Sequence, residues 1–389
     1  MIDLNQMVRV RRQTTTFDFD SPSEFSLREL VPHDVHLSQN VIGKVLVIAG
    51  KHDQHHKIQV HVSVEPRDIS STKAVQCRQT ETALFINLCD LSMEGNSGSN
   101  VPHLKIYVTI AIAPMFELKS FDIHTTHLAI EIAAGVSVTV ENQTVMSTVR
   151  ANITCLEANT FTTRKTIIDV TNGSLMGTWA LRDLLSIKST SGSINIDVVP
   201  KAASEKDPQP ADFIVSSVSG SVAVRYIALN EIPHRDYRVD VKVRSASVSG
   251  MYIHGTRTNI ESTSGSITAD IQPCMTPDCL SRLITHSSSG TTSLRVLSPR
   301  TGCIDPNHLE SRHEATSGSL DIHYPQQWEG MIHGKATTGS LTLKGRDIQV
   351  IKDDRNGPTR SIWARKGNGY SNLNCYTTSG SINLVVGNR

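Results

Sequence analysis

The sequence lacks any hydrophobic run long enough to span a bilayer, which takes about 20 apolar residues. Its best apolar stretch, residues 104–116, is shorter than that and is interrupted by Pro114. The three arginines between positions 9 and 12 are not followed by an apolar segment, so we expect no secretory signal. The localisation is left open: cytoplasmic as the sequence stands, or cell surface and membrane-associated if an anchor lies upstream.

Net charge and aromatic residues are also scarce. Lys and Arg number 38 and Asp and Glu 37, giving a formal charge of +1. That balance excludes a dedicated nucleic-acid binder, which needs a basic face to displace counterions from phosphates. Aromatic residues make up only 5%, whereas Ser and Thr account for 79 of 389 residues. We therefore expect an aliphatic core beneath a surface rich in hydroxyl groups.

Cysteine is infrequent and odd in number, so at least one thiol cannot pair within the chain. The seven cysteines are Cys77, Cys89, Cys155, Cys274, Cys279, Cys303 and Cys375. Cys274 and Cys279 are close together, with Cys303 in the next insertion, and a local disulfide there is conceivable in an oxidising compartment. Their C-x4-C spacing by itself is poor evidence for a zinc site, which needs a second Cys or Cys/His pair, and we expect neither a metal nor a cofactor.

Three sequons occur, at Asn142, Asn152 and Asn172. Each is a possible glycosylation site if the chain is secreted. Chance alone predicts a similar number in a sequence so rich in Ser and Thr, so the sequons do not establish secretion.

One short phrase recurs through the second half of the sequence. It reads Ser/Thr, any residue, Ser/Thr, Gly, Ser/Thr, and then two aliphatic residues separated by one position. The spacing between its glycines varies from 15 to 41 residues, and we take 15 as the bare unit. Variable insertions at one point of a cycle are typical of stacked coils with loops on one side. The repeat glycines are Gly173, Gly192, Gly220, Gly250, Gly265, Gly290, Gly318, Gly339 and Gly380.

Apolar residues alternate on both sides of these glycines, but out of phase. Ile187 precedes Ile194 by seven positions, and Val215 precedes Val222 by seven. An odd separation would put the two residues on opposite faces of one straight strand. The chain must therefore turn near the Ser-Gly step, where glycine tolerates positive φ. Strand, corner, strand and outward loop form one coil, and the sequence predicts an all-β fold, a β-solenoid of nine stacked coils.

A β-sandwich would also show alternating strands and frequent turns, but nothing in it requires the same phrase at each turn. The first third has strand-like stretches without the phrase and predicts a strand-rich cap over the end of the solenoid. We expect a disordered tail over 1–20, an N-terminal β-rich cap region over 21–118 and the β-solenoid over 119–389.

Catalytic signatures are absent: the sequence has no nucleophile elbow, phosphate-binding loop, zinc-protease motif or dinucleotide fingerprint. Polysaccharide lyases and hydrolases built on β-helices need paired acidic or basic groups on successive coils. Asp270 and Asp321 follow their glycines by five and three residues, so they need not stack. We predict no catalytic residue.

Two small clusters allow a functional interpretation beside a structural one. The histidines at 52, 55 and 56 could ligate a metal, but a hairpin tip favours ordinary loop histidines. Trp328, Glu329 and Trp363 could form a sugar-stacking surface, but packing of loops against the solenoid wall is the preferred interpretation.

The Ser-Gly-Ser-aliphatic repeats resemble the putative-adhesin domain family, a group of predicted β-solenoids. The phrases IPHRDYRV (232–239), YPQQWEG (324–330) and WARKGNG (363–369) look like its fungal branch. The resemblance covers roughly 120–389 and implies a binding or scaffolding role, with no catalytic residue to carry over. Fungal members often have an N-terminal transmembrane helix, and no such helix is evident here.

We therefore expect a non-catalytic adhesion, binding or scaffold protein that presents loops along a β-solenoid. Its ligand is unknown; cell-surface or cell-wall glycans and other proteins are the classes considered. The alternative is a carbohydrate-active enzyme, a polysaccharide lyase or hydrolase, with a groove beside the solenoid. A further possibility is self-assembly through open sheet edges.

Overall fold

The computed structural model describes residues 12–31, 41–54, 56–65, 75–88, 104–157, 161–227, 232–274, 280–299 and 308–387. These residues form strands, turns and bends and no helix, which confirms the all-β class. The chain divides into two compact units, Met1–Thr178 and Trp179–Arg389. The sequence-based boundary at residue 118 falls inside the first unit.

Each unit contains two sheets. We call the sheet whose strands precede each corner the front sheet, and the sheet whose strands follow it the back sheet. In the first unit the front sheet has the order β5 (Val75–Gln79), β6 (Ala83–Leu88), β2 (Glu24–Leu30), β8 (Phe116–Thr125), β10 (Val138–Thr148), β12 (Phe161–Val170). The back sheet has the order β1 (Gln13–Phe19), β4 (Ile58–Glu65), β7 (Leu104–Ile112), β3 (Val41–Ala49), β9 (Leu128–Ile132), β11 (Ile153–Cys155), β13 (Leu175–Leu181).

Antiparallel pairs lie at one end of each sheet in the first unit. β1 pairs with β4, β4 with β7, and β5 with β6 in antiparallel fashion, and the other pairs within the unit are parallel. Gln13–Phe19 was expected in a disordered tail but pairs along its whole length with β4, from Gln13 opposite Val64 to Phe19 opposite Ile58. Its inner end is secured by Phe19, which is buried and packs edge-on against Phe25.

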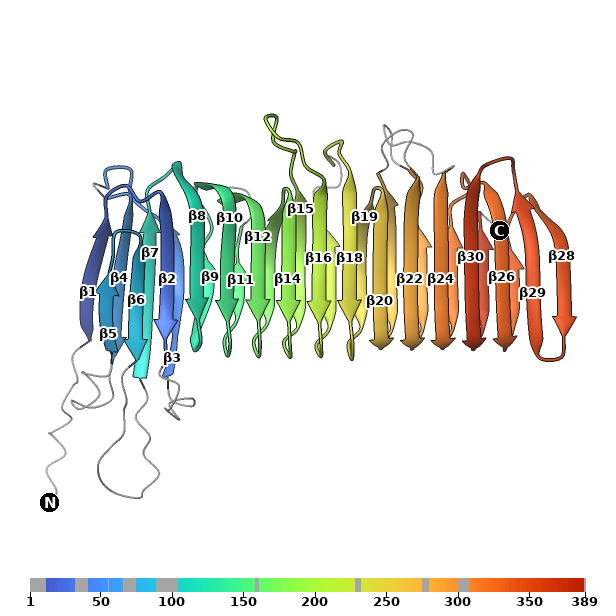
Figure 1. Cartoon of the computed structure of the whole chain (residues 1–389), viewed down its shortest axis with the longest axis horizontal. Helices are drawn as coiled ribbons and strands as arrows, with labels where there is room; N and C mark the ends of the chain where they lie inside the picture. The colour runs from blue at the N-terminus through green and yellow to red at the C-terminus, as the bar shows by residue number, and fades with distance from the viewer. Residues whose placement is uncertain are drawn as a thin grey trace, which may run out of the picture. The chain divides into compact units, whose positions relative to one another are not determined.

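The second unit is a β-solenoid of parallel coils (Figure 1). Its front sheet has the order β14 (Leu184–Ser189), β16 (Ala211–Ser217), β18 (Tyr237–Val243), β20 (Arg257–Ser264), β22 (Ser281–Ser289), β24 (Leu309–Ser317), β30 (Ser371–Ser379), β26 (Gly330–Thr338), β29 (Thr359–Lys366), β28 (Ile348–Asn356). Its back sheet has the order β15 (Ile194–Pro200), β17 (Val222–Tyr226), β19 (Val248–His254), β21 (Ile267–Pro273), β23 (Thr292–Val296), β25 (Leu320–Tyr324), β31 (Ile382–Val386), β27 (Leu341–Lys344).

Equivalent residues of neighbouring coils lie opposite each other. Ile187 of β14 lies opposite Val215 of β16, and Ile194 of β15 lies opposite Val222 of β17. All four side chains are buried, although seven positions separate the two members of each coil. The corner between the front and back strands therefore resolves the change of phase seen in the sequence.

The corner needs glycine because successive coils approach closely there. At Gly290 the φ angle is 136°, and a Cβ would lie 2.4 Å from the carbonyl oxygen of Gly265 in the preceding coil. At four corners a serine three positions before the glycine donates its hydroxyl to the glycine carbonyl, as Ser189 Oγ does to Gly192 at 2.7 Å. Alanine takes this position before Gly318 and Gly339. The glycine of the repeated phrase thus allows the backbones of neighbouring coils to approach closely. Where the phrase begins with serine, the serine hydroxyl also hydrogen-bonds the carbonyl of the corner glycine.

The structure places eight of the nine repeat glycines at corners, and Gly250 is the exception. It lies within β19 opposite Val224, and Ala246 occupies the corner of that coil. The carbonyl oxygen of Ala246 lies 2.1 Å from where a Cβ on Gly265 would be. The segment Ser-Ala-Ser (245–247) replaces Ser-Gly-Ser. The shortest corner spacing is therefore 19 residues instead of 15, both from Gly173 to Gly192 and from Ala246 to Gly265.

The coils follow the order of the chain until β24 and β25, and then the order changes. β30 pairs in parallel with both β24 and β26, and β31 with both β25 and β27. The last coil is thus inserted between two coils that precede it in sequence, and the red β30 lies beside the orange β24 and β26 in Figure 1. The last coil lies on this side of β26 because the hairpin of β28 and β29 occupies the other edge of that strand.

Candidate functional site

Two histidines of the second unit are completely buried and hydrogen-bonded at both ring nitrogens. His254 bonds Thr258 Oγ1 at 2.8 Å and Ser281 Oγ at 2.6 Å. His313 bonds Thr285 Oγ1 at 2.8 Å and the hydroxyl of Tyr324 at 2.9 Å. Burial lowers the pKa of His254 to about 4 and that of His313 to about 3. A Ser–His pair enclosed in this way cannot reach a substrate, so these groups are structural.

A buried carboxylate in the first unit holds a turn. Glu29 accepts hydrogen bonds from the backbone N–H groups of Thr126 at 2.7 Å and His127 at 3.0 Å, and its other oxygen lies 2.7 Å from His127 Nδ1. Burial acts to raise the pKa of Glu29, but the hydrogen bonds from His127 and Thr126 outweigh it and lower that pKa. Glu29 therefore stays ionised and satisfies the turn between β8 and β9.

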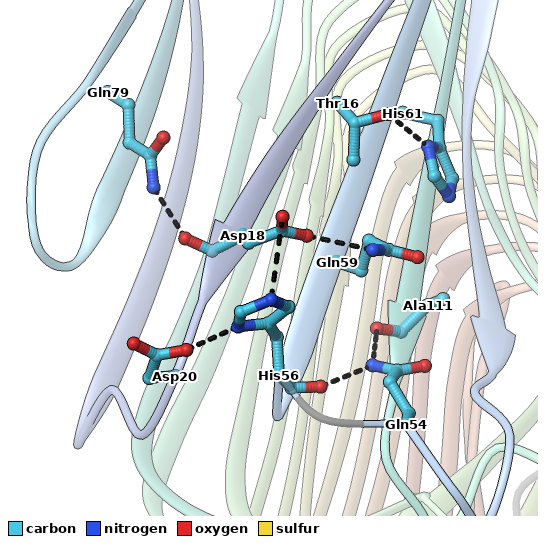
Figure 2. Close-up of polar contacts among 9 residues, drawn as sticks. All are labelled: Thr16, Asp18, Asp20, Gln54, His56, Gln59, His61, Gln79 and Ala111. Carbon is cyan, nitrogen blue, oxygen red and sulfur yellow. Dashed lines mark hydrogen bonds and ion pairs between the residues drawn. The ribbon is translucent and has the colours of Figure 1, made fainter.

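The histidine cluster at 52–56 does not form a metal site in the residues that the structure describes. His56 Nδ1 contacts Asp20 Oδ1, and its Nε2 lies 3.6 Å from Asp18 Oδ2 (Figure 2). The hydrogen bond to Asp20 raises the pKa of His56. Among the described residues no group of three or more His, Cys, Asp or Glu side chains is placed to hold a metal ion. His55 lies outside the described residues.

Acidic groups on the outer face of the back sheet are paired with cations on the next coil. Arg225 donates two hydrogen bonds to Asp197, both at 2.7 Å, and Arg295 donates two to Asp270, at 2.9 and 2.5 Å. Asp321 lies opposite Ser293 in the register and therefore does not stack with Asp270. The two aspartates highlighted by the sequence thus form no catalytic pair.

The aromatic segments between repeats pack against the fold. Trp328 is completely buried and lies edge-on to Tyr324, with ring centroids 5.6 Å apart. Lys366 Nζ donates to the Trp328 carbonyl at 3.1 Å, and Glu329 accepts from the N–H of Asn368 at 2.9 Å. These contacts join YPQQWEG to WARKGNG, so packing rather than sugar stacking accounts for Trp328 and Glu329.

The described thiols and sequons add no reactive group. Burial raises the pKa of Cys77 to about 11 and of Cys155 to about 12, and also raises that of Cys375, so these thiols are protonated at neutral pH. Cys274 is buried, but Cys279 and Cys303 lie outside the described residues, as does Cys89, and the local disulfide stays a prediction. The three sequon asparagines, Asn142, Asn152 and Asn172, are exposed.

A groove of about 390 Å³ lies on the outer face of the front sheet in the second unit, over β22, β24 and β30. The register places Arg282, Glu310 and Asn372 in one row across these strands. Ile284, Arg312 and Asn374 form the next row. The short asparagines of β30 leave space beside the longer side chains of β24. The groove is lined by Arg282, Ile284, Glu310, Ser311, Arg312, Asn372 and Asn374.

The charged groups of this groove form ion pairs. Arg282 Nε donates to Glu310 Oε2 at 3.1 Å, and Arg312 Nη2 donates to Glu314 Oε1 at 2.6 Å. Of the two glutamates, only Glu310 lines the groove itself. The groove therefore presents ion-paired charges beside the amides of Asn372 and Asn374.

Aromatic rings flank both ends of the groove along β30. Tyr370, just before β30, is 79% exposed and stacks on His308, with ring centroids 5.7 Å apart and an interplanar angle of 6°. At the other end, Tyr376 donates to Asn374 Oδ1 at 3.1 Å and bonds His333 Nδ1 at 3.0 Å. A second depression of about 320 Å³ continues along the same strands beyond Tyr376.

Trp363 extends this group of aromatic side chains. It stacks on His333 with ring centroids 3.7 Å apart and is 40% exposed on the outer face of β29. Of the three residues considered for sugar stacking, it alone lies on the same face as the groove.

Sequence reasoning missed the groove. Its residues alternate outward along β24 and β30, and this alternation is visible in the sequence. The two strands, however, are separated in sequence by the hairpin of β28 and β29, and only the inserted last coil brings them together. The exposed Tyr370 just before the final repeat is the one cue that was available.

Comparisons with known proteins give structural likenesses only. No family model and no curated protein matches the chain. A solved structure from Parabacteroides distasonis named a putative adhesin is 11% identical, with a TM-score of 0.31, over 80% of this chain and 93% of that one. A putative cell adhesion protein from Clostridium sporogenes is 10% identical, with a TM-score of 0.16, over 96% and 99%.

A putative adhesin from Parabacteroides merdae is 9% identical, with a TM-score of 0.23, over 80% of this chain and 96% of that one. All three TM-scores lie below 0.5, and no argument about this chain rests on these likenesses. The β-solenoid is established by the strand register described above. Among the described residues no helix is long and apolar enough to cross a membrane.

Proposed function

We propose that the protein is a non-catalytic binding and adhesion module that uses the outer face of the front sheet in its second unit. The observation that carries this proposal is the groove over β22, β24 and β30, whose charged groups are held in ion pairs beside asparagine amides. Such a surface offers hydrogen bonds over a broad area without an acid–base pair. Presentation along a stack of hydrogen-bonded coils keeps those side chains in fixed positions.

Binding and turnover are measured on the same sample of the full chain. The labelled protein is applied to surfaces coated with neutral polysaccharides, polyuronides or proteins, and the supernatant is assayed for released reducing ends and unsaturated uronates. The proposal expects saturable retention on at least one surface without product release. Product release that disappears in Glu310→Gln or Glu314→Gln would instead establish a carbohydrate-active enzyme.

A further inference from the structure

We propose that the groove between β24 and β30 binds an uncharged oligosaccharide laid along the strands, with Tyr370 stacking on a sugar ring. This inference rests on the proposed binding function and names the ligand class for it. The groove and its edge offer three elements that suit a neutral sugar chain: the exposed ring of Tyr370 beside the groove, amide groups, and charges that are held in ion pairs.

The aromatic element is Tyr370. Its ring is 79% exposed, and the parallel His308 ring supports it. A tyrosine held in place by a stacked neighbour loses little conformational freedom on binding, which favours affinity. The apolar C–H face of a pyranose ring can lie on such a surface, whereas a charged or strongly hydrated group gains little from it.

The polar element is the pair of amides that follows on β30. Asn372 and Asn374 alternate outward, two residues apart, and line the groove. Each amide has both a donor and an acceptor, and therefore matches a hydroxyl, which also has both. Asn374 Oδ1 already accepts from Tyr376, so its NH₂ group is the part directed to a ligand.

The length of the site suits a chain rather than a single sugar. Tyr370 and Tyr376 are six positions apart along an extended backbone, which corresponds to about 20 Å. The second depression continues beyond Tyr376 along the same two strands.

The ion pairing of the charged groups selects against anionic chains. In this groove Arg282 is paired with Glu310, and Arg312 with Glu314. A uronate or sulfated chain would meet those glutamates as well as the arginines, and like charges at close range oppose binding. A neutral chain meets no such opposition.

The test is titration calorimetry with neutral oligosaccharides of glucose, mannose and galactose, and with oligogalacturonate as the charged arm. At least one neutral series should bind. Tyr370→Ala should weaken that binding about tenfold or more, because it removes the stacking ring. Asn374→Ala should weaken it about two- to tenfold through one lost hydrogen bond. Tyr370→Phe should bind like the unmodified chain.

Met115→Ala, an equally exposed position in the first unit, is the matched control and should change nothing. Circular dichroism and melting temperatures of the four variants establish that each is folded. Binding confined to oligogalacturonate, or neutral binding unaffected by Tyr370→Ala and Asn374→Ala, overturns the inference and leaves the proposed function standing. Retention only on protein-coated surfaces likewise overturns the inference and leaves the proposed function standing. Failure to bind any tested surface overturns both.

Discussion

Buried polar residues in the second unit are accommodated by neighbours on adjacent coils. The nitrogens of His313 reach Thr285 on β22 and Tyr324 on β25, and those of His254 reach Thr258 on β20 and Ser281 on β22. Each ring therefore joins strands of both sheets across the core. These contacts require a neutral imidazole, because a charged one would have no compensating anion in direct contact.

The stability of the second unit should fall as the pH is lowered from about 6.5 to about 4. In the folded state burial keeps the pKa of His254 at about 4 and that of His313 at about 3. The unfolded chain titrates near the ordinary value of about 6.5, so it binds more protons in this range. The free energy of unfolding should decrease by about 1.4 kcal/mol per pH unit for each histidine. Urea denaturation at pH 7 and at pH 5 measures this decrease in the free energy of unfolding.

His254→Gln separates this effect from general acid sensitivity. The variant removes one buried titrating group, so its loss of stability between pH 7 and pH 5 should be smaller than that of the unmodified chain by about 2 kcal/mol. His323→Gln, at a histidine that is only partly buried, serves as the control and should leave that loss unchanged. Identical losses in all three proteins would show that buried histidines do not govern the acid response.

Among the elements, the inserted last coil determines how the C-terminal part of the second unit is built. β30 supplies both β24 and β26 with a parallel partner, and β31 does the same for β25 and β27. Without it, four strand edges would lose their backbone hydrogen bonds, and buried Leu373 and Ile382 would leave the core. It also supplies the two asparagines of the groove.

Deletion of residues 370–389 should therefore unfold 330–366 while leaving 211–296 folded. Coils far from the deletion keep their neighbours, because each coil contacts mainly the next in a solenoid. Hydrogen exchange should show protection lost in β26 and β29 and retained in β16 to β23. Removal of the exposed segment 205–208, which crosses no strand, is the control and should preserve protection throughout. Retained protection in β26 would mean that β26 closes directly on β24.

For the whole molecule, the question is whether open sheet edges lead to association. In the second unit the front sheet ends at β28 and the back sheet at β27. β28 carries Lys352, Asp353, Asp354 and Arg355 in succession, and β27 is only 4 residues long. Short or charged edges resist pairing with a second chain, although Val350 and Ile351 are exposed on the same strand.

Replacement of Lys352 and Asp354 by valine should allow the edge strand β28 to pair with β28 of a second chain. These two side chains form an ion pair on the exposed strand, and their loss leaves a longer apolar β-prone segment beside Val350 and Ile351. Size-exclusion chromatography with light scattering should show growth with concentration for the double variant and a constant mass for the unmodified chain. Exchanging the two residues for each other keeps the charges and should restore the constant mass. Growth of the unmodified chain would instead establish self-assembly as a native property.

The sequence determined the repeated unit of this protein. Alternating apolar residues specify a strand with one buried face, and a seven-residue step across Ser-Gly specifies a corner, because both are consequences of local backbone geometry. These signals are contained in each coil, so they were readable from residues such as Ile187 and Ile194. The sequence did not indicate that Ala246 takes the place of a corner glycine, because Gly250, four residues later, also matches the repeated phrase.

Only the tertiary structure decided which coils are neighbours. Each coil carries nearly the same edges and the same apolar interior, so its sequence does not say which other coil it must pair with. The hairpin of β28 and β29 occupies one edge of β26 and directs the last coil to the other edge. That choice puts Asn372 and Asn374 beside Arg312 and Glu310, and the groove follows from it.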